Sequence, residues 1–308
     1  MLPYARLTLG PGFRPLRAAL YYAQRLAVAP SLRRGVGAGL AALVNLRTGR
    51  AGRRPALPPE AAMHLTALRQ DGIVSLPPLL SGTALRETMD WLASRPVLGP
   101  QGPVPLAALP PGTASASYPL ETVLRCPHVL EVANDPAILA LAEAYLGCRP
   151  TLSSIGLRWS LPRPDRPTDV QFFHRDPDDW RFLKLFIYLT EVDSGSGPHV
   201  FVRGSHRTVG RLRAQPYHPE ALARRYGTAA MSAVTGAAGT SFLADTWGIH
   251  AGAVPLARPR LMLQVQYSVL PVYALDYRPL PVRPARPLDR YVNRLLLAAA
   301  ERGAVQAA

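Results

Sequence analysis

Two kinds of hydrophobic pattern divide the chain near residue 150. Before it, apolar residues recur at helical spacing in PEAAMHLTALRQDG, SGTALRETMDWLASRP and NDPAILALAEAYLG, with one short strand, IVSLPPLL, after the first. Boundary residues support these three helices, because Ser81 and Asp135 stand at N-cap positions and Gly72 and Gly147 follow the last helical residues. We therefore predict that the first half of the chain is mainly helical.

After residue 150 the pattern changes to short apolar runs with period-two alternation, separated by turn residues. Helices followed by a run of strands indicate helices packed on a β-sandwich or barrel. The last apolar stretch, LDRYVNRLLLAAAERG, predicts a closing helix. The predicted strands are TLSSIGLRWSLP, QFFHRD, RFLKLFIYLTEV, HVFVRG, GTSFLAD and RLMLQVQYSVL.

The predicted elements divide the chain into three parts. Residues 1–55 form a basic N-terminal extension, residues 56–285 form the main β domain with its helices, and residues 286–308 form a C-terminal helix. Within the extension, FRPLRAALYYAQRLAVA (13–29) has the spacing of an amphipathic helix. We interpret it as an accessory helix packed on the main domain. The alternative is an arm that makes weak contact with an anionic membrane or a partner.

The positive charge of the chain is concentrated at its N-terminus. The formal net charge is +15 over 308 residues, and residues 1–59 carry ten Arg without any Asp or Glu. Arg outnumbers Lys by 34 to one, a bias typical of a GC-rich coding background rather than of nucleic-acid binding. We therefore expect no nucleic-acid partner, and the single Lys184 becomes a residue to explain.

Nothing in the sequence indicates a membrane span or a disulfide framework. The longest apolar run, GVGAGLAALVNL (35–46), is flanked by Arg and has the length of a core helix. It also lies too far from Met1 for a standard signal peptide. The two cysteines, Cys126 and Cys148, are too few for a disulfide scaffold, so we expect a cytoplasmic protein.

The stretch QFFHRDPDDW (171–180) contains the candidate chemistry. If its first half is a strand, His174 and Asp176 point to the same face, about 6–7 Å apart along the chain, and can hold one metal ion. His250 follows the strand GTSFLAD and the turn TWG, and it can supply a third ligand. Two His and one carboxylate form the facial ligand set of non-haem Fe(II) oxygenases. The alternatives are an ordinary surface-strand pair at positions 174 and 176 and a hydrogen-bonded core histidine at position 250.

Two basic residues on predicted strands are candidate anion ligands. Alternation places Arg260 on one face of RLMLQVQYSVL with Met262, Gln264 and Gln266, which suits the polar lining of a barrel that holds a ligand. A buried guanidinium needs an anionic partner and can clamp a carboxylate through two hydrogen bonds. Lys184 shares a strand face with aromatic residues, and it either binds an anion or extends its amine to water.

Several motifs in order resemble the phytanoyl-CoA dioxygenase family, over roughly residues 60–270. They are QFFHRD, YLTEVDSGSGPHVFVRGSH and DTWGIHAGAVPLARPRLMLQVQY. The resemblance implies a mainly β fold with flanking helices (α+β), built on a double-stranded β-helix core, the cupin-like jelly roll. The chain departs from the family in one turn, where Ser196 replaces a frequent Asn and Arg203 a frequent Pro. His199 and His206, which flank that turn, are interpreted as structural residues.

By the same resemblance, His174, Asp176 and His250 are the iron ligands, and Arg260 pairs with the distal carboxylate of 2-oxoglutarate. Lys184 is the other candidate anchor for this carboxylate. The implied cofactors are Fe(II), 2-oxoglutarate as cosubstrate, and O2. The implied reaction hydroxylates a C–H bond of a small-molecule substrate and releases succinate and CO2. Desaturation, epoxidation and ring closure use the same ligands.

The sequence does not identify the substrate. Candidate pocket residues flank the metal ligands or lie on the preceding strand: Arg158, Trp159, Arg175, Trp180 and Trp247. Two alternative functions are kept. One is a cupin-like metal-binding enzyme that does not use 2-oxoglutarate. The other is a basic nucleic-acid or membrane-binding protein that acts through residues 1–55.

Overall fold

The computed structural model describes residues 2–53, 55–162, 169–212 and 215–298. Its strands are β1 (Ile73–Leu76), β2 (Val97–Gly99), β3 (Gly102–Val104), β4 (Ser115–Ser117), β5 (Thr151–Ser160), β6 (Phe182–Tyr188), β7 (His199–Val202), β8 (Met231–Val234), β9 (Ser241–Ala244), β10 (His250–Gly252) and β11 (Arg260–Ser268). Its helices are α1 (Pro15–Leu26), α2 (Pro30–Arg47), α3 (Pro59–Asp71), α4 (Gly82–Ala93), α5 (Leu120–Arg125), α6 (Val129–Ala133), α7 (Pro136–Leu146), α8 (Pro219–Tyr226) and α9 (Arg290–Asn293).

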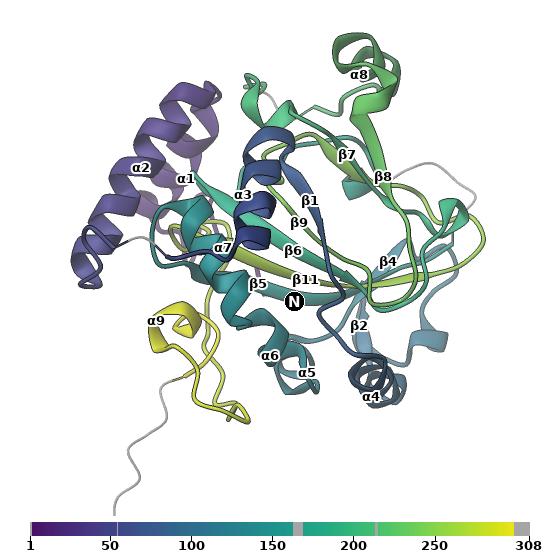
Figure 1. The fold of residues 1–308 in the computed structure, drawn as a ribbon. Helices are drawn as coiled ribbons and strands as arrows, with labels where there is room; N and C mark the ends of the chain where they lie inside the picture. The colour runs from purple at the N-terminus through teal and green to yellow at the C-terminus, as the bar shows by residue number, and fades with distance from the viewer. Residues whose placement is uncertain (1, 54, 163–168, 213–214, 299–308) are drawn as a thin grey trace, which may run out of the picture.

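Two antiparallel sheets face each other across the interior (Figure 1). The larger has the strand order β1-β9-β6-β11-β5-β4 and the smaller the order β10-β7-β8, while β2 and β3 form a separate ribbon. Helices including α5, α6 and α7 cover the outer side of the larger sheet (Figure 1). The architecture is therefore sheet-rich with flanking helices, which confirms the coarser part of the predicted fold class.

Strand β11 separates two cores. Leu261, Leu263 and Val265 face the helices, belong to the main core and are fully buried. Met262 points to the other side, into a smaller core between the sheets that also contains Phe201 of β7. The alternation predicted for this strand is therefore confirmed. It directs the polar positions of β11 into the space between the sheets.

Capping residues set the helix bounds as predicted. The Ser81 hydroxyl accepts a hydrogen bond from the Ala84 N–H at 3.1 Å, and the Asp135 carboxylate caps α7 in the same manner. Helices α3 and α7 are followed by Gly72 and Gly147, whose φ angles are 82° and 83°. These angles lie in the left-handed region, which a residue with a side chain adopts only at a cost.

The segment QFFHRD is not a strand, contrary to the prediction. The chain makes a short 3-10 helix at Asp169–Gln171, followed by two single-residue bridges, Phe173 with Tyr217 and His174 with His250. The two bridges go to different parts of the chain, so no continuous ladder forms. The same-face argument for positions 174 and 176 therefore fails, and their convergence has another cause, described below.

The C-terminal helix is much shorter than predicted. Helix α9 has only four residues, after Asp289 accepts a capping hydrogen bond from Val292 N at 3.0 Å. The chain then turns, so that Leu296 is fully buried and Leu297 bridges Leu280. Burial of these leucines against the main core takes the place of further helix. Residues 299–308 of the predicted helix lie outside the described residues.

The prediction also missed several strands of three or four residues, which carry too little periodicity to recognise. These strands are β2, β3, β4, β8 and β10.

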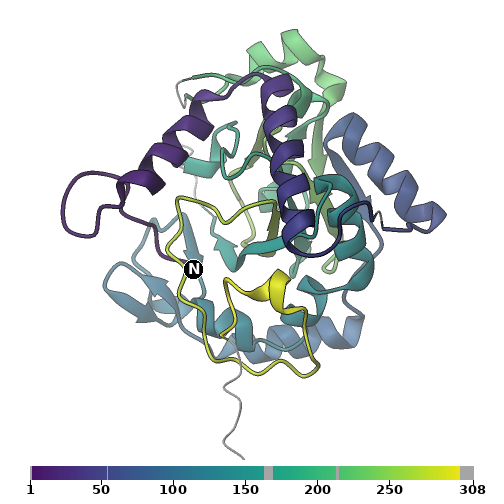
Figure 2. The ribbon, with the colours of Figure 1, turned by 90° about the vertical axis from the view of Figure 1, so that its left-hand side faces the viewer.

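The N-terminal extension packs on the main domain as the two helices α1 and α2 (Figure 2). Arg17 Nε of α1 donates to Tyr273 O at 2.8 Å. Helix α2 contains the run predicted as a core helix, but it is buried along one narrow side only, where Gly37, Ala41 and Val44 lie. Within the described ranges, no helix combines the length and the apolar character that crossing a bilayer requires.

A buried carboxylate joins the extension to the centre of the fold. The Asp179 side chain is fully buried and accepts hydrogen bonds from Leu270 N at 2.9 Å and from Gln24 Nε2 of α1 at 3.4 Å. The Asp179 backbone carbonyl accepts from Arg33 of α2. Burial raises the pKa of Asp179 to about 7, although backbone N–H groups and Arg33 oppose the shift. In the folded protein, the Asp179 carboxyl group therefore keeps its proton at pH values at which the same group of the unfolded chain has lost it.

Replacing Asp179 by Asn should remove a pH-dependent loss of stability. Because the folded pKa is raised, the free energy of unfolding of the native protein contains a contribution that declines between about pH 4 and pH 7. Asp179→Asn stays neutral, so its stability relative to the native protein should rise over this window by on the order of 4 kcal/mol. Urea denaturation at several pH values measures the difference. Asp90→Asn, at an exposed position on α4, is the matched control. Parallel pH profiles for Asp179→Asn and the native protein would contradict the prediction.

Candidate metal centre

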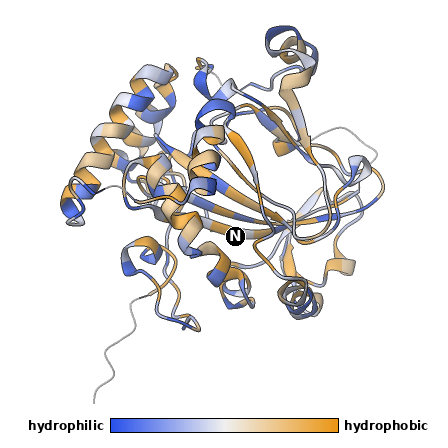
Figure 3. Ribbon diagram, viewed as in Figure 1, coloured by the Kyte–Doolittle hydropathy of each residue, from blue (hydrophilic) through white to orange (hydrophobic). Residues whose placement is uncertain are grey.

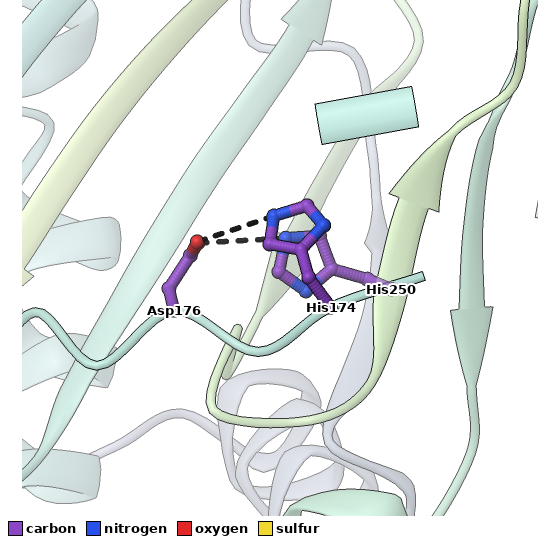
Figure 4. A group of neighbouring side chains, drawn as sticks. All are labelled: His174, Asp176 and His250. Carbon is purple, nitrogen blue, oxygen red and sulfur yellow. Dashed lines mark ion pairs between the residues drawn. The ribbon is translucent and has the colours of Figure 1, made fainter. Parts of the chain in front are cut away.

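Backbone pairing brings three candidate ligands together from two segments that are far apart in the sequence. His174 and His250 form a two-way bridge, in which their backbone N···O distances are 2.9 and 3.0 Å. The Asp176 N–H donates to Thr246 O at 2.9 Å, in the turn before β10. Each segment therefore holds the other in register, and the three side chains converge (Figure 4).

The two imidazoles present the same nitrogen to the carboxylate. His174 Nδ1 lies 2.8 Å from Phe172 O, and His250 Nδ1 lies 3.0 Å from Gly248 O, so each Nδ1–H donates to a carbonyl. Each Nε2 is left as an acceptor, 3.4 Å from an oxygen of Asp176. The three ligand atoms lie within 4.8 Å of one another. Two imidazole lone pairs and a carboxylate directed at one position are a donor set for a divalent cation.

A cationic neighbour, Lys184, keeps Asp176 ionised. Burial by itself would raise the pKa of Asp176, but the Lys184 ammonium reverses this effect, and the pKa lies well below its ordinary value. Lys184 Nζ lies 2.7 Å from Asp176 Oδ2 and 3.0 Å from Asp178 Oδ2. Burial lowers the pKa of His250, which favours the neutral imidazole that a metal ligand requires. Lys184 thus orients the carboxylate, and Asp178 balances part of its charge.

The donor set opens on a cavity of about 240 Å³ between the two sheets. Arg260, Gln264 and Gln266 of β11 line it, as the alternation of this strand predicted. The N-terminal segment contributes another part of the wall, where Leu2 and Tyr4 lie. One wall of the cavity is therefore the polar side of β11, and the apolar side chains of the N-terminal segment form part of another wall.

Arg260 is a buried cation in this cavity. It donates to Gly197 O and to Ser160 Oγ, the latter at 3.1 Å, and its Nε has no hydrogen-bond partner within the described ranges. Burial lowers the pKa of Arg260; the Tyr188 hydroxyl opposes this shift and the Arg158 guanidinium adds to it. No carboxylate among the described residues pairs with it. A buried guanidinium of this kind can bind an anion that is not part of the protein.

Gly252 leaves room for this guanidinium. It follows His250 by two residues on β10, and both residues line the cavity. A Cβ on Gly252 would lie 3.1 Å from Arg260 Nη2, closer than an ordinary contact. A glycine at this position therefore allows His250 and Arg260 to share one cavity.

The candidate pocket residues that flank the ligands have different positions. Arg158 lines the cavity. Trp159 faces the main core, where its Nε1 donates to Tyr118 OH at 3.2 Å. Arg175 stands between two ligands in the sequence but donates to Ser205 O at 3.0 Å and does not line the cavity. Of these three residues, Arg158 lines the cavity onto which the donor set opens, and Arg175 lines a second cavity that His174 also borders.

Trp180 and Trp247 lie beside Arg33 of α2 and not in the cavity of the donor set. The Arg33 guanidinium carbon is 3.8 Å from the ring centroid of Trp247 and 5.8 Å from that of Trp180. Trp247 also lines a second cavity of about 200 Å³, which it shares with His174 and Arg211. His174 therefore borders two cavities.

Sequence reasoning missed two residues of the site. Asp178 holds Lys184 together with the ligand carboxylate. His199, interpreted as structural, lines the cavity with its ring centroid 5.4 Å from that of His250, although it is outside the group of three ligands. Burial, assisted by cationic neighbours, lowers the pKa of His199 well below its ordinary value. Its position depends on the pairing of β7 with β10, where it opposes Gly252, and no local pattern encodes that pairing.

The sequence matches no protein-family model and no curated protein, but solved structures share its fold. EctD from S. alaskensis with bound Fe is 20% identical, over 80% of this chain and 89% of EctD, with a TM-score of 0.51. The structure of EctD with 2-oxoglutarate and 5-hydroxyectoine is 22% identical, over 81% of this chain and 88% of EctD, with a TM-score of 0.50. These matches establish that the chain has the overall fold of EctD.

A divalent metal should stabilise the protein through the three ligands. Co(II) should raise the midpoint of thermal unfolding of the native protein, because it binds the folded donor set and not the unfolded chain. His174→Ala leaves two ligands and should remove most of that increase. His218→Ala is the matched control, since His218 is exposed at the start of α8. Calorimetry with and without metal measures the effect, and an undiminished increase in His174→Ala would show that the metal binds elsewhere.

Proposed function

We propose that the protein is a non-haem Fe(II)- and 2-oxoglutarate-dependent dioxygenase that oxidises a small-molecule substrate. The observation that carries the proposal is that two imidazoles and one carboxylate open on the same cavity as Arg260, a buried cation without a carboxylate partner. A ligand set of two His and one carboxylate leaves coordination positions free for a cosubstrate and dioxygen. EctD, whose fold this chain shares, has been solved with Fe and with 2-oxoglutarate.

The donors around Arg260 suit a dicarboxylate. The 2-oxo acid end of 2-oxoglutarate can chelate a metal, which leaves its other carboxylate for a cation. Arg260 offers its guanidinium with the Ser160 hydroxyl beside it. Gln266 Nε2 is a second buried donor in the same cavity to which no described residue is hydrogen-bonded. Lys184 is the other candidate anchor, but its ammonium is already shared by two carboxylates. We therefore assign the anchor to Arg260.

The chain holds, orients and shields the reacting groups. When bound, iron would supply the activation of dioxygen for attack on a C–H bond, with conversion of 2-oxoglutarate to succinate and carbon dioxide. The carbonyls that accept the Nδ1 protons fix both imidazoles, and Lys184 fixes Asp176. Phe186 and Met262 line the cavity beside the polar residues, where they exclude water from the reacting centre.

We further infer hydroxylation as the reaction and kinship with the phytanoyl-CoA dioxygenase family, including its double-stranded β-helix core. The family's motifs around His174 and His250 occur in order, and the second of them runs through β10 of the smaller sheet and β11 of the larger sheet. Asp176 fills the ligand position that would have to be vacant for a halide to bind the metal, which favours hydroxylation over halogenation. A cavity of about 240 Å³ supports a small molecule as the substrate.

Arg260→Gln should weaken binding of 2-oxoglutarate about 10- to 100-fold, because hydrogen bonds to charged groups contribute roughly 1.5–3 kcal/mol. Binding of Fe(II) should be unchanged, because Arg260 is not a ligand. The measurement is an anaerobic titration of 2-oxoglutarate into the Fe(II)-loaded protein, followed by the weak visible charge-transfer band of the chelate. Arg258→Gln is the matched control, since Arg258 is an exposed arginine that pairs with Asp193.

Two outcomes of this titration would change the assignment. If Arg260→Gln keeps native affinity while Lys184→Met loses it and still binds Fe(II), the anchor is Lys184. If the native protein binds iron without developing the band, the centre belongs to a cupin-like metal enzyme that does not use 2-oxoglutarate, and the proposal is wrong.

Gly252 provides an independent test of the same geometry. Gly252→Ala places a Cβ 3.1 Å from Arg260 Nη2, and Gly252→Val adds two methyl groups that displace the guanidinium further. Affinity for 2-oxoglutarate should therefore fall in the order glycine, alanine, valine, while metal-induced stabilisation persists. Equal affinities across the three proteins would mean that the cosubstrate does not depend on the position of Arg260.

A further inference from the structure

Helix α1 turns its apolar side away from the protein. On its inward side, Gln24 is fully buried and bonded to the main domain, and Arg17 donates to backbone carbonyls. On its outward side, Leu16, Leu20 and Leu26 are 74%, 41% and 67% exposed. A surface helix of a globular protein ordinarily has the opposite orientation, with its apolar stripe toward the core.

Helix α2 also presents leucines to the outside, although Gly37, Ala41 and Val44 make its inward side apolar as well. Arg33 is buried, whereas Leu32, Leu43 and Leu46 are each more than half exposed. Both helices lie on one side of the molecule, the side turned toward the viewer in Figure 2, and Figure 3 shows apolar residues along α2. We call the outward leucines of α1 and α2 the leucine face. It consists of Leu16, Leu20, Leu26, Leu32, Leu43 and Leu46.

Exposed apolar side chains are concentrated in this part of the chain. Of the sixteen large apolar side chains that are exposed among the described residues, nine lie between residues 4 and 46. Concentrated exposure of this kind marks a surface that another structure covers, whereas scattered single residues do not.

The charge around the leucine face restricts what can cover it. Residues 1–59 contain ten Arg and no acidic residue. Several of these arginines are exposed and form no ion pair with any residue that the structure describes: Arg6, Arg14, Arg34, Arg47 and Arg53. The covering structure is therefore apolar in its interior and negatively charged at its surface.

We propose that α1 and α2 dock on an anionic lipid surface. The leucine face enters the boundary between headgroups and acyl chains, and the arginines contact lipid phosphates. The helices lie in the plane of the interface, since neither is long and apolar enough to cross. A second copy of the chain is disfavoured because it would oppose two acid-free, arginine-rich surfaces. A nucleic acid would meet leucines where base stacking needs aromatic rings.

Sedimentation with vesicles tests the proposal on the full-length protein. Vesicles of phosphatidylcholine mixed with phosphatidylserine should bind the protein, and pure phosphatidylcholine should bind it much more weakly. Binding to the anionic vesicles should decrease as salt increases, because the arginine contacts are screened.

Two sets of variants separate the apolar and the charged contributions. The combined Leu16→Ser, Leu20→Ser and Leu26→Ser variant should bind anionic vesicles at least about tenfold more weakly, since three exposed leucines no longer enter the lipid. Arg34→Gln with Arg47→Gln should reduce affinity about thirtyfold, from the loss of two phosphate contacts. The matched controls are Leu256→Ser and the pair Arg283→Gln with Arg286→Gln, which lie outside the two helices and are exposed.

Circular dichroism establishes that each variant is folded, and the arginine pair tests the proposal if the leucine variant is not. Equal binding to both kinds of vesicle, or no binding to either, would overturn the proposal. Loss of binding in the controls equal to that in the variants would also overturn it. A dimer in analytical ultracentrifugation that the leucine substitutions abolish, without vesicle binding, would assign the leucine face to a second copy of the chain.

Discussion

The centre of the molecule depends on three electron-rich groups held pointing at one position. The Nε2 atoms of His174 and His250 and the carboxylate of Asp176 converge within 4.8 Å, and hydrogen bonds to carbonyls and to Lys184 prevent each from turning away. Such groups repel one another unless a cation or a proton lies between them. Because the backbone bridge between the two histidines fixes this geometry in advance, a metal can bind with little rearrangement.

The two-sheet architecture provides the space onto which these three side chains open. Strand β11 anchors itself in the main core through one set of alternating residues and gives the other set to the cavity. Three buried nitrogen atoms in the cavity have no hydrogen-bond partner among the residues that the structure describes: Arg260 Nε, Gln266 Nε2 and His199 Nε2. Buried groups without partners are uncommon in folded proteins. Three such groups in one cavity, next to a donor set for a cation, indicate a binding site for a polar ligand.

Local sequence patterns predicted which side of a strand is buried and where helices begin and end. They did not predict which strands pair across long sequence distances. The caps at Ser81 and Asp135 and the alternation of β11 depend on neighbouring residues, so the sequence encodes them directly. The three side chains that were predicted to meet do meet, but for a different reason. His174 and Asp176 are brought together by bonds to residues 250 and 246, and not by a common strand face. His199 was undervalued because its neighbours come from the pairing of β7 with β10.

The orientation of helix α1 has its origin beside the candidate metal centre. Periodicity predicted a helix at residues 13–29, but the ordinary rule would bury its leucines and expose its polar side. Part of the surface that α1 and α2 cover is the back of the segment that carries Asp176, and this part is polar: the Asp179 carboxylate and carbonyl lie there, next to the ring of Trp247. Gln24 and Arg33 satisfy these groups, so the polar side of α1 and Arg33 of α2 must face inward. The leucines of α1 are then left outside, which means that the scaffold of the donor set itself accounts for the α1 part of the leucine face.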